Sequence, residues 1–574
     1  DQRSMDADGT LTLSEDQDFK NCVFSTVQNP VTGKMRVFLE KRPGLVQDSL
    51  VKAGSPSTGL ISPQSFNASI TAWGNTNSEI FSGTNSLSTI TGRAVNFEET
   101  VRNTTSFVAM KSSDGTAWYY ANGAKDVTSY VGNTINGDFR VSTTTLLSGM
   151  YVGQAITGGQ IGAGARVTSL ISATSTIGLS VAANATSTGA VIFKEPLAKI
   201  TDVDFITTGN PNGAFLDMDG YLIYSDSVNV RNSDLNTLTA YSATALKPAD
   251  MSPDNIVAIA RSKNVVLAFG TGSIQGFQNA GYATGSPLER LTQTYSKIGA
   301  QSQMAVATLE NDIYFLGSSN YGDCQAWRIR DYAPNKISTP FVDKILGTVN
   351  ATGGTNYVSA FQLGGYPYVL VTLSNAVEGA GDKMLLESGD YLLLESGDKL
   401  LLEGNPSSTA SFQRQLACNT ELKVWSEWTC SKATFVVGQG AGSNNNILAT
   451  SRFGTDGKVY RINPASDGNV FTDDGTSYDC QVRTARLDHG TSRRKFISVI
   501  NLVADTQSSG TVTLEASDDD YQTWKTLGTF DLTAKHKNIY RCGSHVNGRA
   551  YRLTHSAAYP FRAEALEITY SLGT

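Results

Sequence analysis

Charged side chains are scarce in this chain, making up 17% of its 574 residues, and histidine occurs only 4 times. Long surface helices depend on Glu, Lys and Arg, so this scarcity disfavours a helical protein. Gly, Ser, Thr and Asn are abundant instead, which favours short strands joined by polar turns. The composition therefore predicts an all-β fold, and the length predicts two to four domains or one repeat architecture with insertions.

Basic residues are too few for a protein that wraps nucleic acid. The formal net charge is −7 and the sequence pI about 5.3, whereas neutralising phosphates needs a surplus of Lys and Arg. We therefore expect DNA to pass such a protein without sequence-specific binding. No apolar run approaches the roughly 18 residues of a membrane helix, and the opening DQRSMDADGT lacks an apolar signal stretch, so we expect no membrane insertion.

Cysteines are few and scattered, without any C-x-x-C pair. Neither a zinc module nor a dense disulfide framework fits this spacing. We expect the thiols to be reduced and buried, and we expect no cofactor. The cysteines are Cys22, Cys324, Cys418, Cys430, Cys480 and Cys542.

A short unit recurs along the chain, in which a turn of Asn, Asp or Gly is followed at once by four to six strand-forming residues. The units are anchored at Trp118, Tyr221, Val265, Ile313, Tyr366, Leu422 and Val459. From Tyr221 onward the anchors are 37 to 56 residues apart, and the longer gap after Trp118 contains a Ser/Thr/Gly-rich block. Periods of about 40 to 50 residues with several short strands per unit are typical of a β-propeller. We predict a propeller core over 95–133 and 196–465, with five to seven blades. A series of β-sandwiches with evenly spaced hairpins is the alternative.

Two segments interrupt this core. Residues 134–195 alternate apolar and small polar residues with very few charges, which predicts a small inserted β module. Residues 383–405 contain the direct repeat LLLESGD, with Glu387, Glu395 and Glu403 in register. This repeat predicts an insertion of short stacked strands within the core.

Both ends differ from the core. Residues 475–574 contain strands with clean alternation, such as KFISVINLVA and AEALEITYSL, which predict a C-terminal β-sandwich-like domain. Residues 1–94 are interpreted as an N-terminal arm and first strands. The first fifty or so are polar and irregular, and would suit an arm lying on a neighbouring subunit.

A possible calcium loop occurs at residues 4–15, with Asp6, Asp8, Gly9 and Glu15 at ligand spacing and Ser4 in place of the usual first Asp. Such a loop needs a helix on each side, and only three residues precede it. We therefore favour an Asp-Gly turn and predict no metal site.

SDDDYQTW, from Ser517 to Trp524, resembles the Asp-box of sialidase-type propellers, with Tyr521 in place of Gly. In that family the motif is a hairpin turn and not a catalytic element.

Arg493 to Lys495 form the only compact basic cluster, interpreted as a solvated strand start or a contact to an acidic partner. The histidines lack metal-ligand spacing, so we predict no catalytic, cofactor-binding or metal residues. They are His489, His536, His545 and His555.

Several segments in order along the chain resemble the tail-nozzle (hub) family of short-tailed bacteriophages, also called packaged-DNA stabilisation proteins. The segments are KRPGL (41–45), KITDVDF and DMDGYLIYSDS (199–227), SPDNIVAIARSKNVVLAFGTGSIQGFQNAG (252–281), NDIYFLG, NKISTP (335–340) and DDDYQTW. The two insertions depart from the family pattern and leave the core assignment standing.

The resemblance implies a non-enzymatic structural protein of the virion, assembled in the host bacterial cytoplasm. It implies a homohexameric ring below the portal and the adaptor, or head-to-tail connector protein, that closes the DNA channel to retain the packaged genome and anchors tail fibres, spikes or a plug. An acidic lumen would repel phosphate and let DNA slide. A receptor- or carbohydrate-binding tail fibre or spike, suggested by residues 134–195, and a propeller glycosidase, suggested by the Asp-box, are the alternatives.

Overall fold

The structure is a computed structural model of the chain. It describes residues 18–573 except for these gaps: 29–34, 51–56, 62–72, 77–78, 83–84, 90–93, 103–104, 113–114, 122–124, 144–154, 163–164, 166, 172–174, 196–197, 207–213, 283–284, 320–321, 351–355, 375–411, 431–437, 440–446, 451–457, 463–469 and 520. Within the described part, regular structure consists of strands apart from a 3-10 turn at Gln303–Ala305 and helix α1 (Pro340–Asn350). The predicted all-β fold is confirmed.

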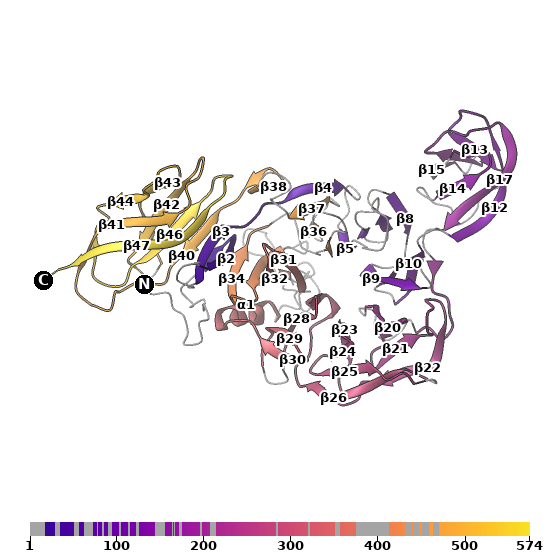
Figure 1. The fold of residues 1–574 in the computed structure, drawn as a ribbon, viewed down its shortest axis with the longest axis horizontal. Helices are drawn as coiled ribbons and strands as arrows, with labels where there is room; N and C mark the ends of the chain where they lie inside the picture. The colour runs from indigo at the N-terminus through magenta and orange to yellow at the C-terminus, as the bar shows by residue number, and fades with distance from the viewer. Residues whose placement is uncertain are drawn as a thin grey trace, which may run out of the picture.

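Seven four-stranded antiparallel units, numbered here as blades 1 to 7, surround a common centre in the described part of the chain (Figure 1). Blade 1 is β5 (Ser57–Ile61), β6 (Trp73–Thr76), β7 (Glu79–Ser82) and β8 (Asn85–Thr89); blade 2 is β9 (Ala94–Arg102), β10 (Thr105–Ser112), β11 (Ala117–Ala121) and β18 (Ala198–Lys199). Blade 3 is β19 (Leu216–Met218), β20 (Tyr221–Ser225), β21 (Asn229–Ser233) and β22 (Tyr241–Pro248); blade 4 is β23 (Ile256–Ser262), β24 (Val265–Gly270), β25 (Ile274–Asn279) and β26 (Leu288–Ser296). Blade 5 is β27 (Val306–Leu309), β28 (Asp312–Gly317), β29 (Gln325–Arg330) and β30 (Ala333–Lys336); blade 6 is β31 (Tyr357–Leu363), β32 (Tyr366–Ser374), β33 (Phe412–Asn419) and β34 (Val424–Trp428). Blade 7 is β35 (Gly438–Gln439), β36 (Ile447–Thr450), β37 (Lys458–Ile462) and β4 (Val46–Leu50), which comes from the N-terminal part of the chain. The predicted β-propeller is therefore confirmed.

The recurring turn-plus-strand unit marks the same place in four successive blades. Tyr221, Val265 and Tyr366 are the first residues of second strands, and Ile313 is the second residue of one. The turns before them are tight two-residue hairpins, and the first residue of each has a positive φ, as short hairpins require. These turns are Asp219–Gly220, Lys263–Asn264, Glu310–Asn311 and Gly364–Gly365. The spacing between the anchor residues is uneven after Tyr366, because the later anchors fall elsewhere in their blades. Leu422 lies in the turn between β33 and β34, and Val459 lies in β37, the third strand of blade 7.

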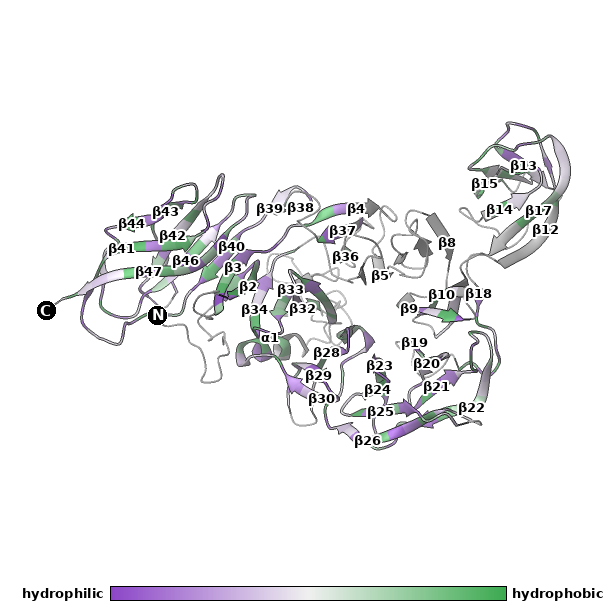
Figure 2. Ribbon diagram, in the orientation of Figure 1, coloured by the Kyte–Doolittle hydropathy of each residue, from purple (hydrophilic) through white to green (hydrophobic). Residues whose placement is uncertain are grey.

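Apolar clusters between consecutive blades hold the ring together. Between blades 3 and 4, for example, Ile223 and Val230 pack with Ile259 and Val266, all of them fully buried. Each such side chain contributes roughly 1.5–3 kcal/mol when it leaves water. Helix α1 adds Val342 and Leu346 to the cluster between blades 5 and 6. Outer strands are more hydrophilic, as the colours of β26 and β30 show (Figure 2).

The propeller begins earlier than the predicted residue 95. Blade 1 lies within 57–89, and β4 closes blade 7 by pairing antiparallel with β37, from Lys458↔Leu50 to Arg461↔Val46 with one register shift. Blade 7 in turn contacts blade 1, which completes the ring. The strands of blade 1 are short and mostly polar, so no strand signal marked them in the sequence.

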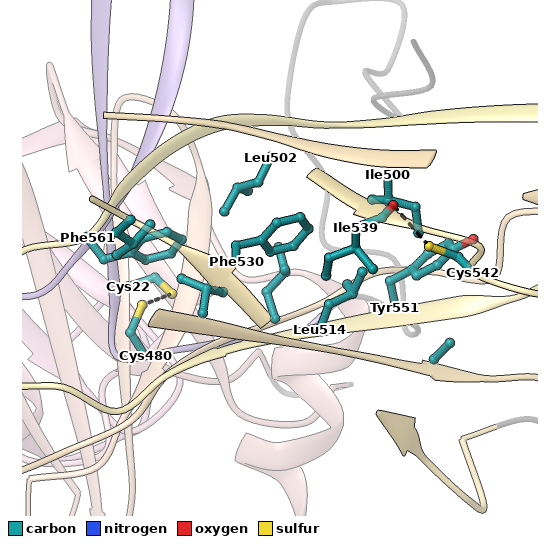
Figure 3. Close-up of a cluster of buried hydrophobic side chains, with 14 of the residues drawn as sticks. Cys22, Cys480, Ile500, Leu502, Leu514, Phe530, Ile539, Cys542, Tyr551 and Phe561 are labelled. Carbon is teal, nitrogen blue, oxygen red and sulfur yellow. Dashed lines mark hydrogen bonds between the residues drawn. The ribbon is translucent and has the colours of Figure 1, made fainter. Parts of the chain in front are cut away.

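The C-terminal domain is a sandwich of two sheets around one apolar core (Figure 3). One sheet has the order β40 (Cys480–Arg483), β46 (Ala550–His555), β42 (Thr511–Ser517) and β43 (Lys525–Asp531). The other has the order β2 (Cys22–Gln28), β3 (Met35–Lys41), β47 (Arg562–Leu572), β41 (Lys495–Ala504) and β44 (Asn538–Tyr540), with β45 (Ser544–His545) also on β41. A hairpin of β38 (Thr472–Asp473) and β39 (Thr476–Ser477) precedes this domain. The predicted C-terminal sandwich is confirmed.

The expected N-terminal arm is corrected by this topology. Residues 22–28 and 35–41 are first strands, as expected, but they are not a free arm, because β2 and β3 belong to the sandwich of their own chain. They complete its second sheet, where Leu39 pairs with Ala563 and Phe24 enters the apolar core. A local pattern cannot reveal a strand whose partner lies more than 500 residues away.

The inserted module begins earlier than predicted. Its sheet has the order β14 (Ala155–Gly158), β17 (Ser187–Glu195), β12 (Lys125–Thr134), β13 (Arg140–Thr143), β16 (Thr176–Leu179) and β15 (Val167–Ile171). The pairing of β12 with β17 runs from Lys125 to Thr134, so the boundary moves from 134 to 125. The module projects from blade 2, away from the C-terminal domain (Figure 1). The LLLESGD repeat at 383–405 falls between β32 and β33, outside the described residues.

Candidate functional site: the junction between propeller and C-terminal domain

A three-residue strand joins the two domains into one sheet. Strand β1 (Asp18–Lys20) pairs in parallel with β34 of blade 6, at Lys20↔Glu427, and antiparallel with β40 of the C-terminal domain, at Phe19↔Val482. The result is a continuous nine-stranded sheet from the propeller centre to the far side of the sandwich. Phe19 packs against apolar clusters of both domains. Relative motion of the domains would have to break backbone hydrogen bonds on one side of β1.

Asn21, directly after this strand, connects three parts of the chain. Its φ of 55° lies in the left-handed region, which Asn tolerates better than most residues. The side-chain amide donates to Thr429 Oγ1 and to Asp479 O, each at 2.7 Å. Its carbonyl oxygen accepts from Thr429 N at 2.8 Å and from Arg42 Nε at 2.9 Å. Asn21 therefore ties blade 6, the start of the C-terminal domain and Arg42 together.

Arg42 is the central charge of the junction and is only 1% exposed. It forms a bidentate ion pair with Asp473 in β38, and its guanidinium carbon lies 3.9 Å from the centre of the Tyr478 ring. All of its N–H groups have acceptors in suitable positions. The acceptors are Asn21 Oδ1 (2.9 Å), Pro43 O (3.1 Å), Asp473 Oδ1 (3.0 Å), Asp473 Oδ2 (2.5 Å) and Thr429 O (3.4 Å). A buried ion pair that is fully hydrogen-bonded fixes one geometry, because each displaced bond would leave a charge unsatisfied.

The next residues of KRPGL fasten the chain to β38. Gly44 N donates to Val470 O at 2.9 Å and Leu45 N to Thr472 O at 3.0 Å, while Asp474 N donates to Leu45 O at 2.8 Å. A Cβ atom on Gly44 would lie 2.2 Å from Thr472 O, so only glycine allows this approach. The KRPGL segment, which carries part of the family resemblance, is thus the place where the propeller closure and the C-terminal domain meet.

Aromatic side chains of blade 6 hold the β2 strand against the propeller. The Tyr368 hydroxyl accepts from Phe24 N at 2.9 Å, and the Tyr366 hydroxyl accepts from Thr26 N at 2.9 Å. Trp428 Nε1 donates to Cys22 O at 3.3 Å. These contacts extend the junction beyond β1 along the first sandwich strand.

His555 and Lys41 are buried on the C-terminal side of the junction. His555 is fully buried and stacks on Phe561 with ring centres 5.3 Å apart, while Lys41 Nζ donates to Ala557 O at 2.8 Å. Burial, with a smaller contribution from the Lys41 charge, lowers the pKa of His555 to about 4. Burial also lowers the pKa of Lys41 to about 8. The folded protein therefore resists protonation of His555.

This histidine should make stability fall in mild acid. An unfolded histidine takes up a proton as pH falls below about 6.5, whereas folded His555 does so only near pH 4, so stability is lost across that window. At pH 5 the loss is about 2 kcal/mol relative to pH 7.5. Denaturant unfolding at both pH values measures this. The free energy of unfolding of His555→Phe should fall by about 2 kcal/mol less than that of the wild type between pH 7.5 and pH 5. The control His536→Gln, at an exposed position, should show the same fall as the wild type. An equal loss in wild type and His555→Phe would contradict the assignment.

A second polar network joins the inner strands of blades 2, 3 and 4. Asp217 binds Arg102 at 2.7 Å and Thr100 at 2.9 Å through its two oxygens, and its carbonyl accepts from Arg261. Glu98 Oε1 accepts from Asp217 N at 2.9 Å, and removal from water raises the pKa of Glu98 to about 8. Two neighbouring carboxyl groups also occur in glycosidases. Here both side-chain oxygens of Asp217 accept hydrogen bonds from Thr100 and Arg102, so the carboxylate links blade 3 to blade 2.

The Asp-box residues form the predicted hairpin turn between β42 and β43. Asp519 accepts from Thr523 N at 2.9 Å and from Ser517 Oγ at 2.8 Å, and Ser517 Oγ accepts from Tyr521 N at 3.1 Å. Tyr521 has a φ of 67°, in the region where glycine is normal. The ring lies near the Arg483 guanidinium, at 5.0 Å from its carbon.

The other predicted features do not converge on one site. Lys495 of the basic cluster is buried and donates to Val546 O at 2.7 Å, so only Arg493 and Arg494 are solvated. The possible calcium loop at 4–15 lies outside the described residues. His489 and His545 lie 6.2 Å apart between ring centres, and no group of three metal-ligating side chains occurs in the part of the chain that the structure describes.

Sequence reasoning missed the junction residues Asn21, Arg42 and Asp473. A signal existed in KRPGL, where two basic residues stand next to Pro and Gly in an otherwise charge-poor chain. The partner carboxylate, however, lies 431 positions away. Among the described helices, none is long and apolar enough to cross a membrane.

Solved structures resembling the chain are remote. An exo-β-1,3-galactanase from Phanerochaete chrysosporium is 9% identical, with 91% of this chain and 100% of that chain covered and a TM-score of 0.24. Hsv2 of Kluyveromyces lactis is 10% identical, with 62% of this chain and 100% of Hsv2 covered and a TM-score of 0.23. Trypanosoma rangeli sialidase is 9% identical, with 97% of this chain and 94% of the sialidase covered and a TM-score of 0.21. Such low scores carry no argument about function.

A family model decides the assignment. No curated protein matches the chain. The family model described as bacteriophage P22 Gp10, beta-propeller, matches residues 90–377, which is half of the chain. The matched range covers blades 2 to 5 and the first two strands of blade 6. The chain therefore belongs to the bacteriophage P22 Gp10 β-propeller family of phage structural proteins.

Proposed function

We propose that this protein is the tail nozzle, or hub, of a short-tailed bacteriophage. Six copies form a ring below the portal and the adaptor, close the DNA channel to retain the genome, and anchor fibres, spikes or a plug. The protein acts through shape and interfaces, without catalysis, as part of a virion assembled in the host cytoplasm. The observation that carries this proposal is the family match through the propeller.

The junction supports a role in resisting force. A ring that retains packaged DNA is under pressure along its axis, and a subunit of two loosely tethered domains would yield. The nine-stranded sheet and the buried Arg42–Asp473 pair couple the domains through backbone and ionic contacts instead. A stiff subunit passes force to its neighbours and to bound fibres.

Charge supports passage of DNA. The net charge of −7 provides no general attraction for phosphate, and DNA that must leave the particle should not be held. We expect the channel lining of the assembled ring to be acidic. A strongly basic lining in an assembled ring would contradict this part of the proposal.

Stoichiometry tests the proposal. Native mass spectrometry of the full chain, alone and with the adaptor, together with imaging of purified particles, should show a hexamer on the tail axis. A trimer placed at the periphery would instead indicate a fibre or spike. Cleavage of a glycan by the purified chain would contradict the absence of catalysis.

A further inference from the structure

Two buried thiols meet at the junction. Cys22 Sγ and Cys480 Sγ are 3.5 Å apart, and the residues are 0% and 1% exposed (Figure 3). Cys22 follows the bridging strand β1, and Cys480 is the first residue of β40. The pairing of β1 with β40 reaches Lys20↔Gln481, which brings the two cysteines next to each other.

We propose that Cys22 and Cys480 form a disulfide when the protein meets an oxidising environment, which fastens the bridging strand to the C-terminal domain. The oxidant is a small disulfide such as oxidised glutathione. One thiolate attacks it, forming a mixed disulfide and releasing a thiolate of the small molecule. The second cysteine thiolate displaces the other half, so one disulfide is made and one is reduced, and the two protons lost by the cysteines end on the two released small-molecule thiols. This inference rests on the junction geometry and is independent of the tail-nozzle proposal.

The geometry needs only a small adjustment. A disulfide has a sulfur–sulfur distance of about 2.05 Å, so the sulfurs must approach by about 1.5 Å. Side-chain rotation can supply much of this, because β1, which ends two residues before Cys22, is already paired with β40, which begins with Cys480.

The other cysteines are buried at different places in the fold. Cys324 and Cys418 belong to the cluster between blades 5 and 6, and Cys430 belongs to the cluster that joins blades 6 and 7. Cys542 lies at the opposite end of the sandwich core from the proposed pair (Figure 3). The close pair is therefore the one to which oxidation should be directed.

Burial determines when the bond can form. The apolar surroundings, and then the neighbouring Cys480 thiol, raise the pKa of Cys22 well above its ordinary value. The Cys22 thiolate is therefore rare in the closed domain, and a bulky oxidant cannot reach it. Formation is therefore fastest during folding, before the two thiols are buried.

Peptide mapping of the wild-type protein tests the proposal. The full chain is refolded with oxidised glutathione, denatured without reductant, alkylated and digested. We expect one cross-linked peptide pair containing Cys22 and Cys480, and alkylation of the other four cysteines. Six alkylated cysteines, or a different pairing, would overturn the proposal.

Thermal unfolding supplies a second readout. The bond closes a loop across 458 positions, and long loops lose the most chain entropy when closed. Oxidised wild type should therefore unfold a few degrees above the reduced protein. Cys22→Ala and Cys480→Ala should abolish this redox-dependent difference, while Cys418→Ala, a buried cysteine in blade 6, should keep it. No difference in cross-linked wild type would contradict the fastening role.

Discussion

Replacing Arg42 by alanine is expected to lower the free energy of unfolding by about 3–5 kcal/mol, because it leaves the Asp473 carboxylate in the junction without its charge partner. Breaking a buried ion pair costs this much since the remaining ion is neither solvated nor compensated. Asn21 and Thr429 would also lose a donor. Denaturant unfolding measures the loss, and limited proteolysis should show cleavage near the junction.

Matched variants separate this effect from the loss of any arginine. Arg330→Ala removes an arginine that is 56% exposed and paired with Asp312, and should change stability by less than about 1 kcal/mol. Arg42→Lys keeps the charge but not the planar fork, and should retain much of the defect. Adding Asp473→Ala to Arg42→Ala should restore part of the stability. Equal losses for Arg42→Ala and Arg330→Ala would show that the junction does not depend on this pair.

Replacing Gly44 by alanine should destabilise the same region by about 3 kcal/mol or more, at the upper end of the cost of overpacking. The new methyl would sit 2.2 Å from Thr472 O and 2.7 Å from Thr472 N, and backbone atoms cannot rotate away as side chains do. Relief requires β38 to move, which pulls Asp473 from Arg42. Thermal unfolding and crystal or solution structures of the variant measure the change.

Gly159 provides the comparison for this substitution. It lies in a turn of the inserted module, and the position that a Cβ atom would take has open space around it. Gly159→Ala should therefore be close to neutral, within about 0.5 kcal/mol. If Gly44→Ala were equally neutral, the close approach of KRPGL to β38 would not be needed for folding.

Local patterns predicted much of the propeller and the sandwich. Tyr221, Val265, Ile313 and Tyr366 were recognisable because a tight turn followed by a strand is encoded within a few residues. The Asp-box turn was predictable for the same reason, since Ser517, Asp519 and Thr523 bond to one another. Where strands were short and polar, as in blade 1, this signal failed.

The all-β class, the repeating blade and the position of its turns depend on neighbours along the chain, so the order of amino acids alone is enough to specify them. The closure of blade 7 by β4, the joining of the two domains by β1, and the meetings of Arg42 with Asp473 and of Cys22 with Cys480 depend on the folded chain as a whole. Those partners are separated by hundreds of residues. Their contacts are selected by packing of the complete chain, and no local periodicity records them.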